Sequence, residues 1–370
     1  MIRVVEKLNA VNNGGIEAFV FKNTFLIQDP GQEIFYYSDN AAASDKYDEG
    51  IKKLGRELFI SSAAEMSGGK IIRKIGKLAA FEKLCKNKDI DIVHVHMSSP
   101  ADYLSGASAK MAGVKKIILH SHSGDRPGAS LPKKFIFSLC RLMMKTCSYR
   151  LLACSEMAGK YMFGADSRFT VVKNGIDTAH FGFDGAVRND IRDKLGLDGR
   201  FVVGHVGRLA KIKNQCFLAD IFKCILEENS NSVLLIAGDG EYEEKIREHI
   251  QALGISERVI FAGAVNDPAP FLFAMDAFVL PSFSEGIPIA AIEAQTAGLK
   301  TICSDKVPAE AAVTGLCTFM PLEASAEEWA EHIISQCDGY DRRSFAEEVK
   351  AAGYDIKETA KQLEKIYSEE

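Results

Sequence analysis

Short β-rich runs alternate with helical patterns along this chain, and the alternation occurs twice. Helical patterns of the first half lie at 67–86 and 100–112. The first series of runs is IRVVEKL, EIFYYS, DIVHVH, KIILHSH, RLLACS and FTVVKNG, and the second is FVVGHVGRL, VLLIAGDG, VIFAGAV, AFVLPS and LKTICSD. Apolar strands that alternate with amphipathic helices form parallel sheets covered by helices on both faces. The sequence therefore predicts an α/β fold with two Rossmann-like domains.

A polar, glycine-containing stretch around 182–199 separates the two series of strands. A chain of 370 residues is also too long for one ordinary core. We therefore expect an N-terminal domain at 1–182 and a C-terminal domain at 198–349, with their sheets facing a central cleft. Ligands of such sheets bind outside the carboxyl ends of the strands. Functional residues are therefore expected directly after strands.

The composition is that of a globular protein, with 47% hydrophobic residues and no Gly/Ser-rich or Pro-rich tract. No apolar run approaches the roughly 18 residues that span a bilayer. The first residues lack the apolar region of a signal peptide, which favours a cytoplasmic location. Nine cysteines are scattered singly, a pattern typical of reduced thiols that indicates no metal site.

Charge is distributed unevenly along the chain. Residues 1–180 contain 26 Lys and Arg and 18 Asp and Glu, a net charge of +8, whereas residues 181–370 carry −13. This asymmetry predicts that the first half faces an anionic partner. The alternative is a chance imbalance on solvated surfaces.

The segment 133–150, KKFIFSLCRLMMKTCSYR, mixes five basic residues with seven apolar ones. Together with Lys70, Arg73, Lys74 and Lys77, it predicts a basic amphipathic surface that attaches peripherally to an anionic membrane. The alternative is a helix that packs in the core and leaves a basic edge in solvent.

The run PSFSEGIPIAAIEAQTAG predicts a strand, a loop and a helix. The strand ends at Ser282, Pro288 suits the first position of a helix, and Gly298 ends that helix. Free N–H groups and the dipole at the helix start favour an anion such as a diphosphate. Gly286 and Ile287, in the loop before the helix, are therefore candidate diphosphate contacts.

Two carboxylates, Glu285 and Glu293, flank this helix start. A carboxylate offers two acceptor oxygens, which suits the vicinal diols of a ribose or a hexose. The alternative is a solvated pair on a surface helix. The apolar neighbours of Glu293 argue against it, because they indicate a buried stretch.

The turn Gly207–Asn214, GRLAKIKN, follows a strand and precedes a helix. Arg208 supplies a planar guanidinium and Lys213 a point charge, and both groups bind phosphate. Negative charge builds on a diphosphate as its glycosidic bond breaks, so cations are required there. Two solvated basic residues are the alternative.

Gly14 and Gly15 follow the first strand. Adjacent glycines let a backbone approach a ligand closely, and the following helix exposes N–H groups. A phosphate or acceptor contact and a plain tight turn are both open. The sequence is not GxGxxG, so a dinucleotide fingerprint is absent.

Four histidines alternate on two strands, His94 and His96 in DIVHVH and His120 and His122 in LHSHS. A neutral imidazole at a strand end can bind a sugar hydroxyl. His122, nearest its strand end, is the candidate functional residue, and His94 is expected to be structural. A metal site is not expected, because no acidic or thiolate partner lies close in the sequence.

Several of these motifs together resemble the retaining glycosyltransferases of family 4, which have the GT-B fold. The motifs are GRLAKIK, AGDGE, SEGIPIAAIE and KNGID, and the resemblance extends from Gly14 to about residue 300. The sequence is more closely similar to bacterial capsular and exopolysaccharide glycosyltransferases through HSHS, ACSEMAGKYMFG, HVGRLAKIKNQ and SEGIPIAAIEAQTAG.

The resemblance implies roles for individual residues. Glu285 and His122 would lie by the donor hexose and be catalytic, and Glu293 would bind the nucleotide ribose. Arg208 and Lys213 would hold the diphosphate. Gly14 and Gly15 would lie near the β-phosphate and the acceptor.

The family also implies transfer with retention of configuration and without a metal or a cofactor. A final helix at about 350–370 would cross back onto the N-terminal domain. Many members read EGFG where this chain reads Glu285-Gly286-Ile287-Pro288, which puts the identity of the donor sugar in doubt.

The expected activity is transfer of a hexose or N-acetylhexosamine from a nucleotide-sugar, in the first place a UDP-sugar, to a saccharide or lipid-linked saccharide in capsular or exopolysaccharide biosynthesis. The expected location is the cytoplasm or the cytoplasmic face of the membrane, with no nucleic acid partner. One alternative is a nucleotide-sugar 2-epimerase of the same fold. Another is a non-catalytic protein that binds a sugar nucleotide.

Overall fold

The computed structural model describes residues 1–11, 14–40, 45–63, 69–122, 131–145 and 148–369, and only the backbone of 131–134 and 145. The contacts divide the chain into two compact units. Unit 1 consists of residues 1–175 and 356–370, and unit 2 of residues 176–355. The divisions therefore lie after Gly175 and Asp355, whereas the sequence analysis places them at 182–198 and before 350.

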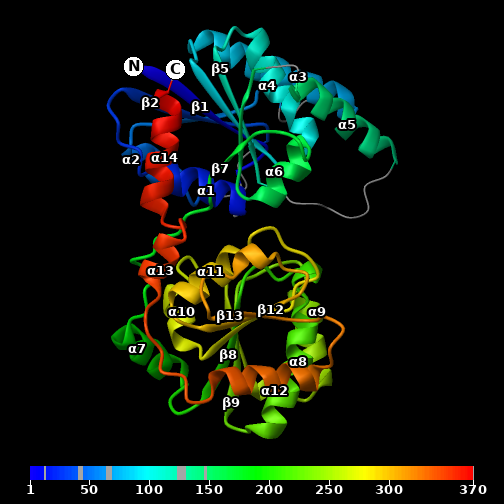
Figure 1. Cartoon of the computed structure of the whole chain (residues 1–370), viewed down its shortest axis with the longest axis vertical. Helices are drawn as coiled ribbons and strands as arrows, with labels where there is room; N and C mark the ends of the chain where they lie inside the picture. Colours follow the sequence, from blue (N-terminus) through cyan, green and yellow to red (C-terminus); the bar gives the residue numbers. More distant parts are fainter. Residues whose placement is uncertain (12–13, 41–44, 64–68, 123–130, 146–147, 370) are drawn as a thin grey trace. The chain divides into compact units, whose positions relative to one another are not determined.

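Unit 1 contains a parallel sheet of seven strands in the order β3-β2-β1-β4-β5-β6-β7 (Figure 1). The strands are β1 (Ile2–Leu8), β2 (Gln32–Ser38), β3 (Glu57–Ile60), β4 (Ile92–Met97), β5 (Lys116–Ser121), β6 (Arg150–Ala153) and β7 (Thr170–Val171). The helices are α1 (Gly15–Thr24), α2 (Asp48–Lys53), α3 (Lys70–Asn87), α4 (Tyr103–Met111), α5 (Leu131–Lys145), α6 (Glu156–Phe163) and α14 (Ile356–Ser368), with a 3₁₀ turn η1 at Pro100–Asp102.

Two apolar cores cover the faces of this sheet. Val4 of β1 packs on one face with Phe19 of α1 and Leu363 of α14, and Val5 packs on the other face with Phe81 of α3. Successive side chains of a strand point to opposite faces, so an inner strand of a sheet that is covered on both sides buries its side chains on both faces. Consequently, a charged residue inside β1 must find its partners within the core.

Unit 2 contains a parallel sheet of six strands in the order β10-β9-β8-β11-β12-β13. The strands are β8 (Phe201–Val206), β9 (Ser232–Ala237), β10 (Val259–Gly263), β11 (Ala277–Leu280), β12 (Lys300–Ser304) and β13 (Cys317–Met320). The helices are α7 (Gly185–Leu195), α8 (Gln215–Glu228), α9 (Glu243–Ala252), α10 (Ala269–Ala274), α11 (Ile289–Thr296), α12 (Ala326–Cys337) and α13 (Ala346–Ala351), with 3₁₀ turns η2 (Lys211–Lys213), η3 (Ser256–Arg258) and η4 (Ala309–Ala311). The prediction of two parallel-sheet α/β domains is therefore confirmed.

The C-terminal segment differs from the single final helix expected at about 350–370. Two helices, α13 and α14, are separated by a turn in which Gly353 has a φ of 82°. This left-handed conformation suits glycine and ends α13. Helix α14 then packs in unit 1, where Ile366 and Tyr367 are buried with the core of the first sheet (Figure 1).

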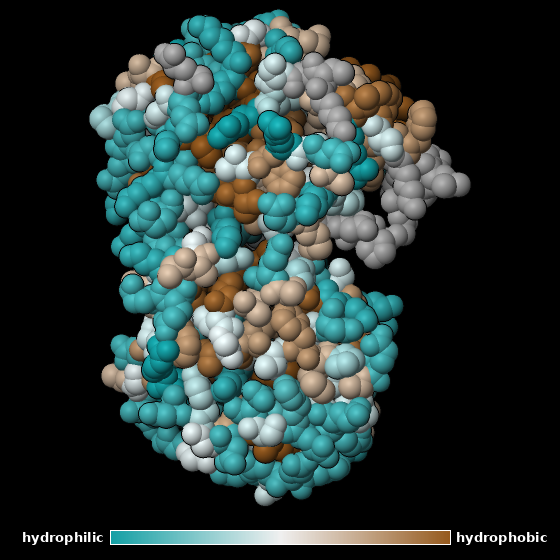
Figure 2. Space-filling view, in the orientation of Figure 1, coloured by the Kyte–Doolittle hydropathy of each residue, from teal (hydrophilic) through white to brown (hydrophobic). Residues whose placement is uncertain are grey.

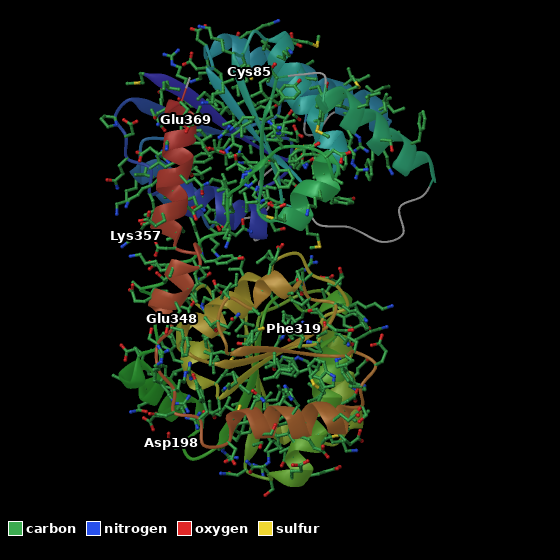
Figure 3. The ribbon with its side chains drawn as sticks, in the orientation of Figure 1. Cys85, Asp198, Phe319, Glu348, Lys357 and Glu369 are labelled. Atoms are coloured by element: carbon green, nitrogen blue, oxygen red, sulfur yellow. The ribbon has the colours of Figure 1, made fainter. Side chains whose placement is uncertain are left out.

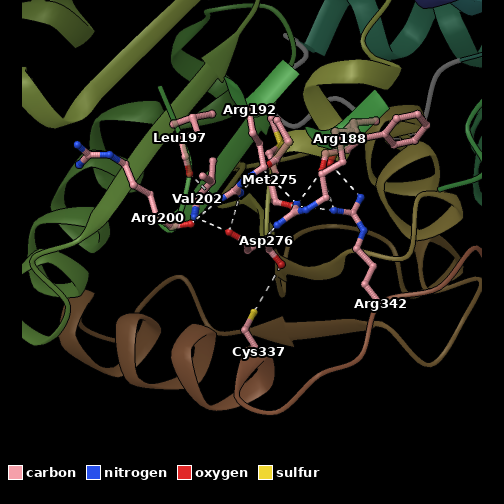
Figure 4. Close-up of polar contacts among 12 residues, drawn as sticks. Arg188, Arg192, Leu197, Arg200, Val202, Met275, Asp276, Cys337 and Arg342 are labelled. Atoms are coloured by element: carbon pink, nitrogen blue, oxygen red, sulfur yellow. Dashed lines mark hydrogen bonds and ion pairs between the residues drawn. The ribbon is translucent and has the colours of Figure 1, made fainter. Parts of the chain in front are cut away.

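A cluster of charges holds unit 2 together at the amino ends of its strands (Figure 4). Asp276 lies directly before β11 and pairs with Arg188 at 2.5 Å and with Arg192 at 3.3 Å. Arg342 donates to the carbonyl of Met275 at 2.7 Å. Burial, reinforced by the nearby charge of Arg188, lowers the pKa of Arg342 to about 9. Because ligands bind at the opposite, carboxyl edge of such sheets, this cluster is a structural anchor.

Side chains fill both faces of each sheet (Figure 3). Cys85 on α3 is one of them, and burial raises the pKa of its thiol to about 12. None of the eight cysteines among the described residues forms a disulfide bond. The expectation of unpaired cysteines therefore holds for these eight, and Cys147 lies outside the described residues.

Candidate functional site

In unit 2, the loops after β8 and β9 are held together at the carboxyl edge of the sheet. The N–H of Gly207 donates to Ala237 O at 3.0 Å, and that of Leu209 donates to Asp239 O at 2.7 Å. A Cβ at Gly238, whose φ is 142°, would lie 2.0 Å from the carbonyl oxygen of Gly207. Gly238 of AGDGE is therefore required by the close approach of the two loops.

The loop after β11 joins the same edge. Its Phe283 N–H donates to Ile212 O of η2 at 2.8 Å. Next to this contact, Nζ of Lys213 lies 2.6 Å from Oε1 of Glu285, and both side chains are mostly buried, at 21% and 11% exposure. The structure thus joins two residues that the sequence analysis assigned separately to the diphosphate and to the hexose.

Arg208 has a fixed backbone and an open side chain. Its carbonyl accepts from Nε2 of the buried Gln215 at 3.0 Å, and the same Nε2 lies 3.3 Å from Nε2 of His205. Burial lowers the pKa of His205 to about 4, so this imidazole is neutral at neutral pH. No described residue makes a hydrogen bond or ion pair with the exposed guanidinium of Arg208, which leaves it open to an anionic ligand.

Helix α11 begins as the sequence indicates, one residue later than predicted. Pro288 is the N-cap instead of the first helical residue, and Gly298 follows the helix with a φ of 71°. Within the described chain, no group accepts a hydrogen bond from the N–H of Gly286 or Ile287. Together with the dipole of α11, these N–H groups form a potential anion site beside Lys213 and Glu285.

Glu293 lies on α11 with 7% exposure, which confirms the buried stretch expected from its apolar neighbours. A buried carboxylate is not a solvated surface group. The solvated alternative is therefore wrong for Glu293.

In unit 1, Gly14 and Gly15 lie at the start of α1. Gly14 is the N-cap with a φ of −89°, so the backbone there does not require glycine. A Cβ on Gly15 would meet no atom within 4 Å, and one on Gly14 would meet only the flexible end of Glu17 at 2.5 Å. Gly15 thus leaves open space at the N-terminus of α1, as close approach of a ligand requires.

The four histidines converge on one carboxylate, Glu6 of β1, which is completely buried. In the register of the sheet, Glu6 pairs with His94, and His96 pairs with His120. Nε2 of His96 lies 2.7 Å from Oε2 of Glu6, and Nδ1 of His96 lies 2.9 Å from Nε2 of His122. The expectation that the histidines have no acidic partner close by was therefore wrong, because Glu6 comes from a strand about 90 residues earlier.

Helix α14 supplies a further member of this cluster. The hydroxyl of Tyr367 donates to Oε1 of Glu6 at 2.6 Å and lies 2.7 Å from Nδ1 of His94. Nε2 of His94 lies 3.2 Å from Nδ1 of His120. We refer to Glu6, His94, His96, His120, His122 and Tyr367 as the Glu6 cluster.

Burial and mutual contacts shift the protonation of the Glu6 cluster. Burial alone would raise the pKa of Glu6, but electrostatic attraction and hydrogen bonds from His94 and His96 hold it well below its usual range. Burial, with the neighbouring His94, lowers the pKa of His96 to about 4. Burial likewise holds the pKa values of His120 and His122 well below 6.5.

The nitrogens of His94, His96 and His120 lie within 4.8 Å of one another, close enough to hold a metal ion. However, these imidazoles already use nitrogens in contacts with Glu6, with Tyr367 and with each other. The absence of a metal stays a prediction. The lack of an acidic partner no longer supports it, because Glu6 is such a partner. Sequence reasoning missed Glu6 and Tyr367, and the signal for Glu6 was a carboxylate inside a strand next to HVH.

A cavity of about 380 Å³ opens in unit 1 after β1 and β2. Its lining residues are Asn9, Asp39, Asn40, Lys70, Arg73, Lys74, Lys77, Leu78, Ala101, Asp102 and Ser105. Nζ of Lys77 lies 2.5 Å from Oδ1 of Asn40, and Asp39 is paired at 2.7 Å with the buried Lys7. The four basic residues that the sequence analysis grouped with segment 133–150 thus line a cavity at the ligand-binding edge of the sheet.

Helix α5 exposes apolar side chains, and Figure 2 shows a brown patch over this part of unit 1. Phe135 is 72% exposed and Leu142 60%, and Ile136, Leu139 and Met143 are also exposed. The alternative of a core-packed helix is therefore wrong for these residues. Arg141 is engaged with carbonyls of α6, and the side chains of Lys133, Lys134 and Lys145 lie outside the described residues.

No helix in the described parts of the chain combines the length and the apolar character needed to cross a membrane.

Two family models match the chain, one in each unit. Residues 30–180 match the model "Glycosyltransferase Family 4", and residues 187–351 match "Glycosyl transferases group 1". The two matches together span most of the chain.

Curated relatives and solved structures agree with these matches. The putative glycosyltransferase EpsF of Bacillus subtilis is 28% identical over 99% of this chain and 96% of its own length. An Escherichia coli UDP-Gal:α-D-GlcNAc-diphosphoundecaprenol α-1,3-galactosyltransferase is 32% identical over 64% of this chain and 63% of its own. Anabaena Alr3699/HepE, solved with UDP, superimposes with a TM-score of 0.80 at 16% identity, covering 99% of this chain and 100% of that one.

Proposed function

Since the chain belongs to the family 4 glycosyltransferases with the GT-B fold, we propose that it transfers a hexose or N-acetylhexosamine from a UDP-sugar to a lipid-linked saccharide, with retention of configuration and without a metal. The observation that carries this proposal is the group at the carboxyl edge of the second sheet. There the Lys213–Glu285 pair lies beside the N–H groups that precede α11, and Arg208 follows the neighbouring strand.

The diphosphate of the donor binds Arg208, Lys213 and the N–H groups of Gly286 and Ile287. These donors stabilise the negative charge that builds on the diphosphate as the bond to the sugar breaks. Glu285 accepts hydrogen bonds from hexose hydroxyls, and Glu293 accepts them from the ribose.

The acceptor oxygen forms its bond to the anomeric carbon on the face from which the diphosphate leaves, and its proton passes to the leaving diphosphate. Configuration is therefore retained. Protein cations supply the charge stabilisation that a metal ion would otherwise provide.

Two comparisons support uridine as the base. The Escherichia coli relative is named for UDP-galactose, and HepE was solved with UDP and with UDP-glucose. The Staphylococcus aureus relative CapH, which is named for capsular polysaccharide biosynthesis, supports assembly of a cell-surface polysaccharide as the pathway.

The basic cavity of unit 1 supports a diphosphate-linked lipid acceptor. Lys70, Arg73, Lys74 and Lys77 line it, and clustered cations bind a diphosphate. Ile71, Ile72 and Ile75 of α3 are exposed beside them, as are the apolar residues of α5. We propose that this surface rests on the cytoplasmic face of the membrane, where a lipid-linked acceptor would be embedded.

The donor is identified by thermal shift with a panel of UDP-, GDP- and ADP-sugars. A nucleotide-sugar at ~100 times its Kd adds about 2.7 kcal/mol to the stability of the folded state. We expect UDP-sugars to give the largest shift. A larger shift with GDP- or ADP-sugars would contradict the assignment of the base.

Substitutions in the donor site and beside it test which residues bind the UDP-sugar. We expect Arg208→Ala to lower kcat by about 10²–10³-fold, because a donor to the developing charge is lost, and Glu293→Gln to raise KM for the UDP-sugar. Lys211→Ala, which removes an exposed cation of the same turn, is the matched control and should keep full activity. Full activity of Arg208→Ala and Glu293→Gln would show that the site is placed wrongly.

Incubation with UDP-GlcNAc without an acceptor tests the epimerase alternative. A transferase gives at most slow hydrolysis, whereas an epimerase gives a changed hexosamine still attached to UDP.

A further inference from the structure

We propose that Glu6 and His96 are positioning residues that hold His122 in one tautomer, so that Nδ1 of His122 accepts a hydrogen bond from a hydroxyl of the bound sugar. The assignment of the tautomer rests on the geometry of the Glu6 cluster alone. Its consequence for the sugar rests on the proposed function.

The chain of hydrogen bonds starts at Glu6, because an ionised carboxylate can only accept. Oε1 accepts from the Tyr367 hydroxyl at 2.6 Å, and Oε2 lies 2.7 Å from Nε2 of His96. Nε2 of His96 therefore carries a proton and donates it to Glu6.

The direction continues from His96 to His122. Burial, with the nearby His94, lowers the pKa of His96 to about 4, so this imidazole is neutral and its Nδ1 has no proton. The Nδ1 lies 2.9 Å from Nε2 of His122. Because a bare nitrogen can only accept, His122 carries its proton on Nε2.

The chain of hydrogen bonds ends at Nδ1 of His122, an acceptor that no described residue uses. Burial keeps the pKa of His122 well below 6.5, so His122 is neutral as well and its Nδ1 has no proton. No described residue donates to this Nδ1, which is also shielded from solvent. Nε2 of His120 also has no partner among the described residues, but His120 is completely buried within β5, whereas His122 follows that strand and is only partly buried.

Residues from three elements fix the start of this chain of hydrogen bonds. Glu6 belongs to β1, His94 and His96 to β4, and Tyr367 to α14. The ring of Phe19 on α1 lies 5.0 Å from that of His122 and 6.1 Å from that of His96. The imidazole planes therefore have little freedom, which preserves the direction of the hydrogen bonds.

The tautomer decides which ligand group is recognised. With a bare Nδ1, His122 binds a hydroxyl as the donor, and an analogue that lacks this hydroxyl leaves the nitrogen unpaired. With a proton on Nδ1, the same residue would present a donor. Glu6 and His96 thus influence sugar selection without touching the sugar.

Glu6→Gln reverses this chain of hydrogen bonds when its amide nitrogen takes the place of Oε2. The glutamine oxygen then takes the place of Oε1 and accepts from Tyr367, and the NH₂ group faces Nε2 of His96 and Nδ1 of His94, which lie 2.7 and 3.2 Å from Oε2 in the wild-type protein. In this orientation the NH₂ group donates to Nε2 of His96. His96 then carries its proton on Nδ1 and donates to Nε2 of His122, whose own proton moves to Nδ1. The number of protons on the two imidazoles is unchanged.

The test is the long-range ¹H–¹⁵N NMR spectrum of the histidine rings, which distinguishes the two tautomers. The wild-type protein should show His122 protonated on Nε2, and Glu6→Gln should show it protonated on Nδ1. Tyr367→Phe is the matched control, because Glu6 keeps its carboxylate and its contact with His96, so His122 should stay protonated on Nε2. A wild-type His122 protonated on Nδ1 overturns the proposal even if Glu6→Gln does not fold.

Kinetics provide a second readout. We expect Glu6→Gln to lower kcat/KM for the preferred UDP-sugar by about tenfold, and to lower it much less for the deoxy analogue that lacks the recognised hydroxyl. Preference for the complete sugar is thus lost, which general destabilisation would not cause. An equal loss for both sugars overturns the role in recognition.

The two proposals fail in different ways. If the protein transfers no sugar but the spectra are as expected, the proposed function is wrong and the tautomer assignment stands. If Zn²⁺ shifts the ring signals of His94, His96 and His120 and stabilises the protein, the cluster is a metal site and the assignment is overturned.

Discussion

Lys213 and Glu285 are separated by 72 residues in the chain and form an ion pair at 2.6 Å. A mostly buried carboxylate requires a partner, and Lys213 provides one before any ligand binds. In the proposed reaction the same ammonium group also faces the diphosphate. Lys213 therefore holds Glu285 in position and also stabilises the negative charge of the leaving diphosphate. A sequence motif cannot separate these two roles.

Gly15→Ala tests whether the glycine pair serves a ligand. A Cβ at this position meets no protein atom within 4 Å, so the free energy of unfolding should stay the same or rise by up to about 1 kcal/mol. If a substrate approaches the start of α1, the transfer rate should fall roughly ten- to hundredfold, because the reacting groups are displaced. Denaturant unfolding and a transfer assay measure the two effects.

Gly185→Ala is the matched control for this prediction. Gly185 is also the first residue of its helix, α7, and a Cβ there also meets no atom within 4 Å. It should leave the transfer rate unchanged. Full activity of Gly15→Ala would show that the glycine pair is a plain tight turn.

Individual residues were predictable where they follow strands. Arg208, Lys213, Glu285 and Glu293 all lie at the carboxyl edge of one sheet or on the helix that starts there. Glu6 was not predictable in this way, because its partners depend on which strands become neighbours. A charge in a strand is normally assigned to a solvated face, but helices cover both faces of this sheet.

At the scale of elements, α5 carries a prediction about membrane contact. Its exposed Leu139 and Leu142 make little contact with the core, so Leu139→Glu/Leu142→Glu should change stability by less than about 0.5 kcal/mol. The variant should bind vesicles with anionic phospholipids several-fold more weakly, because each added carboxylate disfavours both the apolar interface and the anionic surface. Vesicle sedimentation at low and high salt measures this.

Met111→Glu is the control for α5. Met111 ends α4 and is 74% exposed, so the substitution adds a negative charge to unit 1 away from α5. Equal loss of binding in both proteins would indicate attraction through net charge alone, and would contradict a specific contact through α5.

Most elements were predictable because apolar strands and amphipathic helices alternate regularly. The strands β3 and β13 were missed, since both are four-residue edge strands without a fully buried position. Helix α7 was taken as a polar linker. Its start depends on a cap in which the Asp184 side chain accepts from the N–H groups of Ala186 and Val187, and its end on Gly196 with a φ of 63°.

At the scale of the whole molecule, the two units should differ in acid stability. Unfolded imidazoles bind a proton near pH 6.5, whereas burial keeps His96, His120 and His122 of unit 1 neutral in the folded state. Each therefore contributes stability that is complete above pH 6.5 and is lost at about 1.4 kcal/mol per pH unit as the pH falls below 6.5 towards the pKa of the folded state, which is about 4 for His96. In unit 2, His205 is affected in the same way, and His332 is shifted in the same direction. Acid should therefore destabilise unit 1 more.

The single tryptophan of the chain provides the measurement. Trp329 is buried in unit 2, so its fluorescence reports on that unit, whereas far-ultraviolet circular dichroism reports on both. In urea, the circular dichroism signal should start to fall before the fluorescence changes, and the gap between the midpoints should be wider at pH 5 than at pH 7.5. A gap that is unchanged or reversed at pH 5 would contradict the prediction.

Unit 1 is assembled from residues 1–175 and from α14, with the 180 residues of unit 2 between them. A ribosome therefore completes the first sheet long before it synthesises Tyr367, the hydroxyl partner of Glu6. At about 5–20 residues per second, the delay is roughly 10 to 40 s. During that time the nascent chain exposes the apolar face that α14 will cover, and Glu6 lacks one of its donors. Unit 1 can thus reach its native structure only after unit 2 has been translated. In this interval the incomplete unit 1 is exposed to chaperones and proteases.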